Sequence, residues 1–304
     1  MNNKVVLIGC GNVGMAFAYS LINQKNYCDE LVLIDINTDK CEGEAEDLNH
    51  SVMYAGSPIK VTAGTYKDCK DAKIVVISAG ANQAVGETRM DLINKNSNIF
   101  KSIVNDVMNS GFNGIFVVAT NPLDVMTYLI LKYSKLPKNK VLGTGTTLDT
   151  ARLRYIIANK LNVCQKDIQA YVIGEHGDSE FIPWSNANIA LTSIKTFINK
   201  NEREQIEEDV RNAAYEIIKK KGATAYGIGA CLTRIVNSIL ENKKTILTVS
   251  SYDEKNKVCI STPAIIDKDG VRNKIHIPLT EEEANKLQNS INVIKQAIDS
   301  IEGE

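Results

Sequence analysis

Short apolar runs alternate with segments of helical periodicity through the first half of the chain. Apolar positions recur at helical spacing over residues 15–21, directly after the first run, and the same order then repeats. Alternating strands and helices indicate a parallel sheet with helices on both faces. We therefore predict an α/β fold built on a Rossmann doubly wound parallel sheet. The predicted strands are residues 5–8, 31–34, 59–61, 74–78, 115–118 and 141–142.

The pattern changes after Gly143. Glycine and threonine residues lead into a predicted helix at 148–161, and two more helices are expected at 201–221 and 224–240. Residues 245–250, 258–266 and 271–277 predict antiparallel strands joined by polar turns. Thr280 and Glu283 have the spacing of a capping box at the start of a final amphipathic helix. We predict one domain over residues 1–143 and a second, α+β domain over residues 144–304.

The composition is that of a globular protein. The 304 residues are 44% hydrophobic and 23% charged with a formal net charge of −1, which gives no basic field for nucleic acid. No apolar run reaches the ~20 residues of a membrane span, and no signal segment is visible. The seven cysteines are an odd number without a C-x-x-C pair. This favours free thiols, no metal site and a cytoplasmic location.

A glycine-rich turn follows the first predicted strand and precedes the first helix. Gly9, Gly11 and Gly14 form G-x-G-x-x-G, which allows a tight turn, the approach of a pyrophosphate to the backbone, and close packing of helix on strand. Asp35 ends the second strand about 20 residues further on, where a carboxylate can bind the adenosine ribose and repel a 2′-phosphate. Each feature alone is compatible with an ordinary turn. Together they predict an NAD site.

Small and polar residues cluster after the fourth and fifth predicted strands. Residues 79–89 form a loop before a long helix, and Asn121-Pro122 follows the next strand. Ligands of doubly wound sheets bind outside the carboxyl ends of the strands, so we expect both segments to border the site. A simple turn at Asn121-Pro122 is the alternative interpretation.

His176, one of three histidines, lies on a turn fenced by glycines and acids, Gly174-Glu175-His176-Gly177-Asp178. A histidine near a carboxylate can exchange protons close to neutral pH. Asp149 and Arg152 lie three residues apart on a predicted helix and therefore share a face. Structural alternatives are a hydrogen-bonded loop histidine, a surface ion pair, and a capping box of Thr146 with Asp149.

Taken together, these segments resemble the L-lactate dehydrogenases of the lactate/malate dehydrogenase family along essentially the whole chain. The resemblance implies NADH-dependent reduction of pyruvate to (S)-lactate and the reverse reaction. It rests on motifs in the family's order and spacing: Gly9 to Gly14, Asp35, Ala81-Asn82-Gln83 with Gly86-Glu87-Thr88-Arg89, Asn121-Pro122, Asp149-Thr150-Ala151-Arg152, Gly174 to Asp178, and Gly222-Ala223-Thr224.

The resemblance also implies a role for each side chain. His176 would donate a proton to the substrate oxygen, and Asp149 would hold its other ring nitrogen. Arg152 would bind the substrate carboxylate through two parallel hydrogen bonds. Arg89 would polarise the carbonyl when its loop closes, and Asn121 would bind near the substrate oxygen and the nicotinamide. The implied cofactor contacts are Gly9, Gly11, Asn12, Val13, Gly14, Asp35, Ala79, Gly80 and Asn121.

Gln83 and Thr224 are implied to line the other end of the substrate. Malate dehydrogenases carry an arginine at the position matching Gln83, to meet the second carboxylate of oxaloacetate. The neutral Gln83 would leave that carboxylate unpaired, which favours the methyl group of pyruvate. The nearest alternative is a malate or broader L-2-hydroxy-acid dehydrogenase. A catalytically silent NAD-sensing protein would be expected to have lost His176, Asp149 or Arg152.

The resemblance has two further implications, for regulation and assembly. Bacterial members activated by fructose 1,6-bisphosphate have an arginine matching Arg154 and a histidine where this chain has Tyr171. Only one of the two effector residues is therefore matched. The family implies a homotetramer that acts on a small 2-oxo or 2-hydroxy acid.

Overall fold

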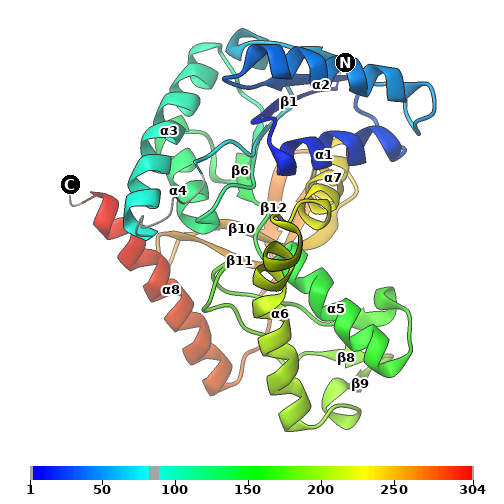
Figure 1. Ribbon diagram of the computed structural model, residues 1–304. Helices are drawn as coiled ribbons and strands as arrows, with labels where there is room; N and C mark the ends of the chain where they lie inside the picture. The colour runs from blue at the N-terminus through cyan, green and yellow to red at the C-terminus, as the bar shows by residue number, and fades with distance from the viewer. Residues whose placement is uncertain (1–2, 82–88, 303–304) are drawn as a thin grey trace.

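A nine-stranded mixed sheet runs through the molecule (Figure 1). The computed structural model describes residues 3–81 and 89–302. Six strands are parallel, in the order β3-β2-β1-β4-β5-β6, which is the doubly wound order that the alternating pattern predicts. These strands are β1 (Lys4–Ile8), β2 (Glu30–Ile34), β3 (Lys60–Ala63), β4 (Ile74–Ile77), β5 (Ile115–Val118) and β6 (Val141–Gly143).

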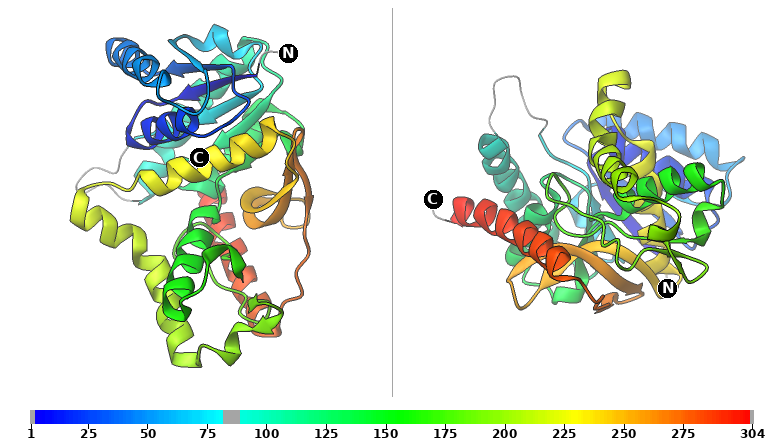
Figure 2. Two further views of the ribbon diagram at one scale, coloured as in Figure 1. Left: turned by 90° about the vertical axis from the view of Figure 1, so that its right-hand side faces the viewer. Right: turned by 90° about the horizontal axis from the view of Figure 1, so that it is seen from below.

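Helices cover both faces of this sheet (Figures 1 and 2). Val5 and Leu7 of β1 join a core with α1, α2 and α7, whereas Val6 and Ile8 join a core with α3, α4 and α8. Because successive side chains point to opposite faces, a strand covered on both sides must be apolar throughout. The covering helices are α1 (Asn12–Asn23), α2 (Thr38–Val52), α3 (Arg89–Asn109), α4 (Leu123–Ser134), α7 (Tyr226–Leu240) and α8 (Glu281–Glu302).

The antiparallel strands predicted for the second half extend this same sheet. β10 (Thr245–Asp253) is antiparallel to β6, with Ser250 opposite Gly143. β11 (Val258–Asp267) and β12 (Gly270–Lys274) follow outward. Helix α7 also returns to lie beside α1 (Figure 2). Periodicity identifies a strand but not its neighbour, so the sequence did not reveal that the two halves share one sheet.

A third core lies below the large sheet. It joins α5 (Thr147–Leu161) and α6 (Lys200–Lys221) to a small antiparallel sheet through buried apolar side chains such as Leu153 and Val210. The small sheet contains β7 (Ile168–Gln169), β8 (Asn188–Ile189) and β9 (Thr192–Ser193). Single 3₁₀ turns are η1 (Tyr66–Cys69), η2 (Lys138–Lys140), η3 (Gln165–Asp167) and η4 (Ile194–Thr196).

Local signals predicted element ends to within a few residues. The capping box before α8 is confirmed: Thr280 N donates to Glu283 Oε2 at 3.0 Å, and Glu283 N donates to Thr280 Oγ1 at 3.3 Å. Helix α7 begins at Tyr226, after Ala225 as its N-cap, and not at Thr224. All seven cysteines are free thiols. Across residues 3–81 and 89–302, we find no helix with the length and apolarity needed to cross a membrane.

Candidate active site

The glycine turn between β1 and α1 lies at the carboxyl edge of the sheet. Gly9 has φ +102°, and a Cβ there would lie 2.5 Å from Ala79 N. A Cβ on Gly14 would lie 2.0 Å from Gly9 O, so this close packing requires glycine. Gly11 differs, because a Cβ there would meet nothing within 4 Å. It caps α1 without a side-chain bond, which leaves its first-turn N–H groups available to a phosphate.

Asp35 lies beside this turn at the end of β2. Its Oδ2 accepts from Cys10 N at 2.7 Å, and its Oδ1 accepts from Asn37 N at 3.0 Å. Asn12 and Val13, the first residues of α1, complete the turn. A carboxylate next to a glycine-rich helix start is the arrangement that holds the ribose and pyrophosphate of NAD. The residues present therefore fit the dinucleotide.

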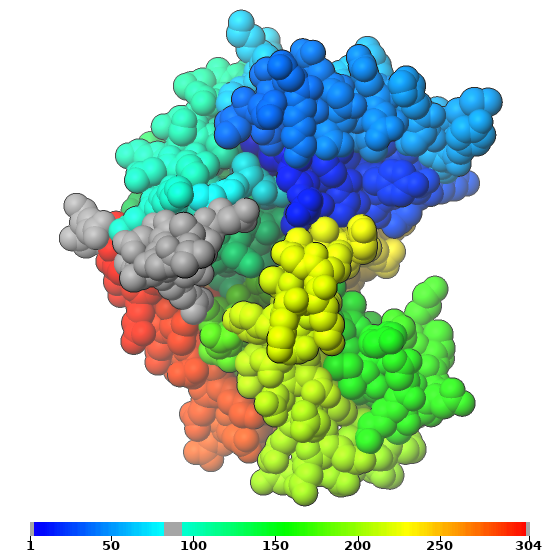
Figure 3. All heavy atoms as spheres, in the orientation of Figure 1, coloured from blue at the N-terminus to red at the C-terminus, as the bar shows by residue number. Residues whose placement is uncertain are grey.

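The segments after β4 and β5 are joined at the same edge. Thr120 Oγ1 donates to Ala79 O at 2.7 Å, and a Cβ on Gly80 would lie 2.5 Å from Thr120 Cγ2. Asn121 is exposed, and its bond to Pro122 is cis. In the space-filling view a hollow opens at the centre of this face, bordered by dark blue N-terminal atoms and yellow atoms near α7 (Figure 3).

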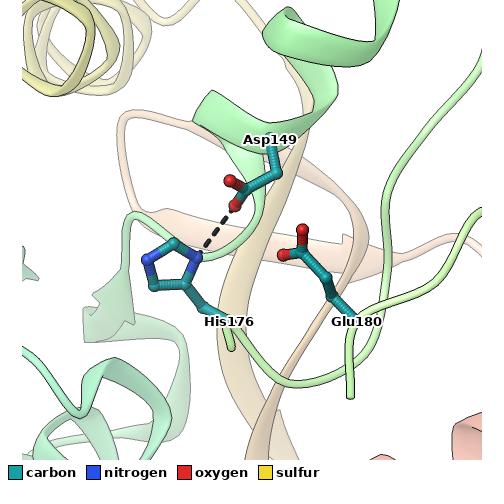
Figure 4. Close-up of side chains that lie close together, drawn as sticks. All are labelled: Asp149, His176 and Glu180. Atoms are coloured by element: carbon teal, nitrogen blue, oxygen red, sulfur yellow. Dashed lines mark hydrogen bonds and ion pairs between the residues drawn. The ribbon is translucent and has the colours of Figure 1, made fainter. Parts of the chain in front are cut away.

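His176 and Asp149 meet across two segments far apart in the chain. His176 Nδ1 lies 2.8 Å from Asp149 Oδ2 (Figure 4). Arg152 Nη1 donates to Asp149 Oδ1 at 2.7 Å. The Asp149 side chain is only 3% exposed, against 13% for Arg152 and 25% for His176. The predicted shared face of Asp149 and Arg152 is confirmed. The capping-box alternative is wrong, because Thr146 Oγ1 donates to Val172 O.

Hydrogen bonds to β11 and to Asp124 of α4 fix the turn that carries His176. Gly174 has φ +105° and exchanges two backbone hydrogen bonds with Ser261 of β11, at 3.0 and 3.1 Å. His176 N donates to Asp124 Oδ2 at 2.7 Å. Ser250 of β10 donates to the other oxygen of Asp124 at 2.5 Å. This buried acid therefore ties the histidine turn to α4 and to β10.

Charge around the imidazole favours its protonated form. Burial would lower the pKa of His176, but the neighbouring Asp149 carboxylate and its hydrogen bond outweigh burial and raise that pKa to about 9. Burial alone would raise the pKa of Asp149, yet the charges of His176 and Arg152 hold it below its usual range. The pair is therefore imidazolium and carboxylate at neutral pH.

Two more buried acids surround this pair. Burial raises the pKa of Asp124 to about 6, against the hydrogen bond from Ser250. Burial and the charge of Asp149 raise the pKa of Glu180 to about 9, so it holds its proton at neutral pH. Figure 4 shows Glu180 pointing toward Asp149 and His176. One atom of each lies within 4.8 Å of the others, a spacing that a metal ion could span. His176 and Asp149 bond to each other instead, and the raised pKa of Glu180 favours its uncharged form.

The structure describes only some of the other residues predicted to bind the substrate. Gln83 lies outside the described residues, as does the side chain of Arg89, whose backbone begins α3. Thr224 is half-buried just before α7, and Gly227 of α7 packs against Leu148, the residue before Asp149.

Four further residues near the site were not identified from the sequence: Asp124, Glu180, Ser250 and Asn96. Only Asp124 gave a signal, as a lone acid in an apolar helix.

The two residues compared with the effector site contact each other. The guanidinium of Arg154 lies over the ring of Tyr171, with Cζ 4.9 Å from the ring centroid. Arg154 Nε also donates to Ala170 O at 3.0 Å. This arginine is therefore held by its own chain.

Known proteins match the chain over nearly its whole length. Residues 3–143 match the family model for the lactate/malate dehydrogenase NAD binding domain, and residues 146–304 match the alpha/beta C-terminal domain. An L-lactate dehydrogenase of Macrococcus caseolyticus is 50% identical, with 96% of each chain covered. One from Borrelia hermsii is 48% identical, covering 99% of this chain and 98% of the relative.

Solved structures agree with these sequence matches. A lactate dehydrogenase from a Medee basin deep-sea metagenome has a TM-score of 0.96 at 45% identity, with 99% of each chain covered. The minor L-lactate dehydrogenase of Enterococcus mundtii, in its ligands-bound form, has a TM-score of 0.95 at 43% identity, covering 99% of this chain and 98% of that one.

The chain belongs to the lactate/malate dehydrogenase family. It is an oxidoreductase whose cofactor is NAD.

Proposed function

We propose that this chain is an L-lactate dehydrogenase that interconverts pyruvate and (S)-lactate. The observation that carries the proposal is the contact of His176 with Asp149, on a carboxylate that also binds Arg152, next to the dinucleotide edge of the sheet. Relatives named L-lactate dehydrogenase at 48–50% identity support it. NADH, when bound, supplies the hydride for the carbonyl carbon.

His176 then supplies the proton. Its Nδ1 bonds to Asp149, so Nε2 is the atom that donates to the developing alkoxide and later accepts the proton from lactate. A pKa of about 9 keeps that proton on the ring at neutral pH. Asp149 fixes the tautomer and stabilises the cation, as the buried acid of a hydrolase triad does.

Arg152 binds the substrate carboxylate in this proposal. Nη1 donates to Asp149, and the rest of the planar guanidinium fork is suited to two parallel hydrogen bonds with a carboxylate. Asn121 binds near the substrate oxygen and the nicotinamide, and Arg89 polarises the carbonyl. Gln83 and Thr224 line the methyl end of pyruvate.

The test compares pyruvate with oxaloacetate as NADH oxidation at 340 nm. A neutral Gln83 cannot pair a second carboxylate, so we expect kcat/KM to favour pyruvate by about a hundredfold or more. Gln83→Arg adds the missing cation and should shift the preference toward oxaloacetate. Preference for oxaloacetate in the wild type would identify a malate-type enzyme. Turnover of neither, with NADH still bound, would support the silent sensor.

The proposal extends to assembly, location and domain roles. We propose a homotetramer in the cytoplasm, as the family resemblance implies. We also propose that residues 1–143 are the NAD-binding domain and that residues 144–304 are the catalytic domain, which supplies His176, Asp149 and Arg152 to the substrate site. The matches of two separate family models at 3–143 and 146–304 support that division.

A further inference from the structure

Asn96 of α3 joins two loops of the site through a single side chain. It is 1% exposed. Its Oδ1 accepts from Ala81 N at 2.8 Å, and its Nδ2 donates to the backbone oxygen of Asn121 at 3.2 Å. Ala81 follows β4, and Asn121 follows β5. One amide therefore fixes the distance between the carboxyl ends of two adjacent parallel strands.

Both loops carry residues of the proposed reaction. In the sequence Gln83 follows Ala81 by two residues, and the backbone of Arg89 begins α3. The other loop presents Asn121 and leads to Asp124, which holds the backbone of His176. Asn96 lies about two turns into α3, so its two hydrogen bonds anchor α3 to Ala81 and to Asn121.

The chemistry of this position requires an amide. Asn96 must accept from one backbone N–H and donate to one backbone C=O at the same time. An aspartate could accept from Ala81, but it would set a carboxylate oxygen against the Asn121 carbonyl. Packing leaves little room for adjustment, because a Cβ on Gly80 would already lie 3.4 Å from Asn96 Oδ1 and 2.5 Å from Thr120 Cγ2.

We propose that Asn96 is a positioning residue of the dehydrogenase reaction: it holds residues 79–81 in register with Asn121, and so places Asn121 against the substrate. The inference rests on the proposed function. In this role Asn96 acts through its hydrogen bonds to the backbone of both segments.

The variant Asn96→Asp tests this role in the full-length protein. Kinetics are measured well below the unfolding temperature and expressed per NADH-binding site. Misplacement of substrate-contacting groups should lower kcat/KM for pyruvate about tenfold or more. The pH midpoint of the reaction should stay at the wild-type value, because His176 and Asp149 are untouched. Asn98→Asp, the same change at an exposed position of the same helix, should match the wild type.

The outcomes separate this inference from the proposed function. If the wild type does not reduce pyruvate, the proposed function fails. If the wild type does and Asn96→Asp equals Asn98→Asp per binding site, with only a lower Tm, then Asn96 is merely a core residue and the inference fails. If Asn96→Asp does not fold, a measurement on the wild-type protein still tests the proposal. Hydrogen exchange should find the Ala81 amide protected, and exchange at the rate of an open loop would overturn the proposal.

Discussion

The buried Asp149 carboxylate interacts with two cationic side chains at once, His176 and Arg152. One oxygen bonds to the His176 ring and the other to Arg152. Burial disfavours the charged form of Asp149, and the charges of His176 and Arg152 stabilise that form. Removing the charge of Asp149 should therefore lower the pKa of His176 while the fold is kept.

Asp149→Asn should shift the pH profile of pyruvate reduction to lower pH. In the wild type the rate needs protonated His176 and falls as pH rises through about 9. Without the carboxylate, burial lowers the histidine pKa, so the midpoint should fall by about two units or more. The measurement is kcat/KM for pyruvate against pH at saturating NADH. Asp178→Asn, at the exposed acid of the same turn, is the control. An unmoved midpoint in Asp149→Asn would contradict the assignment.

Arg152→Lys should weaken pyruvate binding without weakening NADH binding. The positive charge stays, but a single ammonium replaces the planar fork, and we expect KM for pyruvate to rise on the order of tenfold to a hundredfold. Steady-state kinetics give the KM, and NADH fluorescence gives the cofactor affinity. Arg154→Lys, two residues further along the same helix, should leave both values unchanged. Equal pyruvate KM values in Arg152→Lys and the wild type would rule out the carboxylate contact.

At the scale of elements, α1 and α7 pack with their backbones close together. A Cβ built on Gly229 of α7 would lie 2.7 Å from the carbonyl carbon of Ala16, and the contact is with backbone that cannot rotate away. Helix α1, which we propose to bind the phosphates, is thereby supported by a helix from the second half. Side chains of Leu232 and Val236 continue the same buried face.

Gly229→Ala should destabilise the protein by about 1–3 kcal/mol, because a methyl group must be accommodated between two helix backbones. The expected result is a lower Tm and a lower urea midpoint in the absence of NADH. Ala230→Ser, on the exposed side of α7, should change the free energy of unfolding by about 0.5 kcal/mol or less. Equal stability of the two variants would mean that α1 and α7 move apart freely.

Sequence predicted the elements and motifs well and the contacts between distant segments poorly. Gly9, Gly14 and Asp35 were recognisable because their spacing along one βαβ unit fixes their geometry. Asp124 was not, because its partners Ser250 and His176 come from strands and turns whose adjacency appears only after folding. Composition and periodicity give no information on such long-range pairs.

At the scale of the molecule, the large sheet crosses the proposed domain boundary. β10 of the second half pairs with β6 of the first, and α8 covers the face that α3 and α4 share. The two halves therefore share both of their main cores. Residues 144–304 alone would expose the edge of β10 and the apolar face of α7.

We expect one cooperative unfolding transition for the whole chain. Because each half buries apolar surface of the other, neither should melt separately, and NADH should raise the single transition as a unit. Differential scanning calorimetry with and without NADH measures this. Two resolved transitions, with only the first shifted by NADH, would indicate that the halves fold independently.

Cys164 stands apart from the other six cysteines, since it is exposed whereas they are buried. Burial raises the pKa of several of those thiols, so a maleimide dye should attach at this one position without any engineered substitution. Cys164 follows α5, about 20 Å along the helix from Asp149 at the other end. The unmodified sequence thus offers a single thiol handle, at the opposite end of α5 from Asp149, for immobilising the enzyme on an electrode.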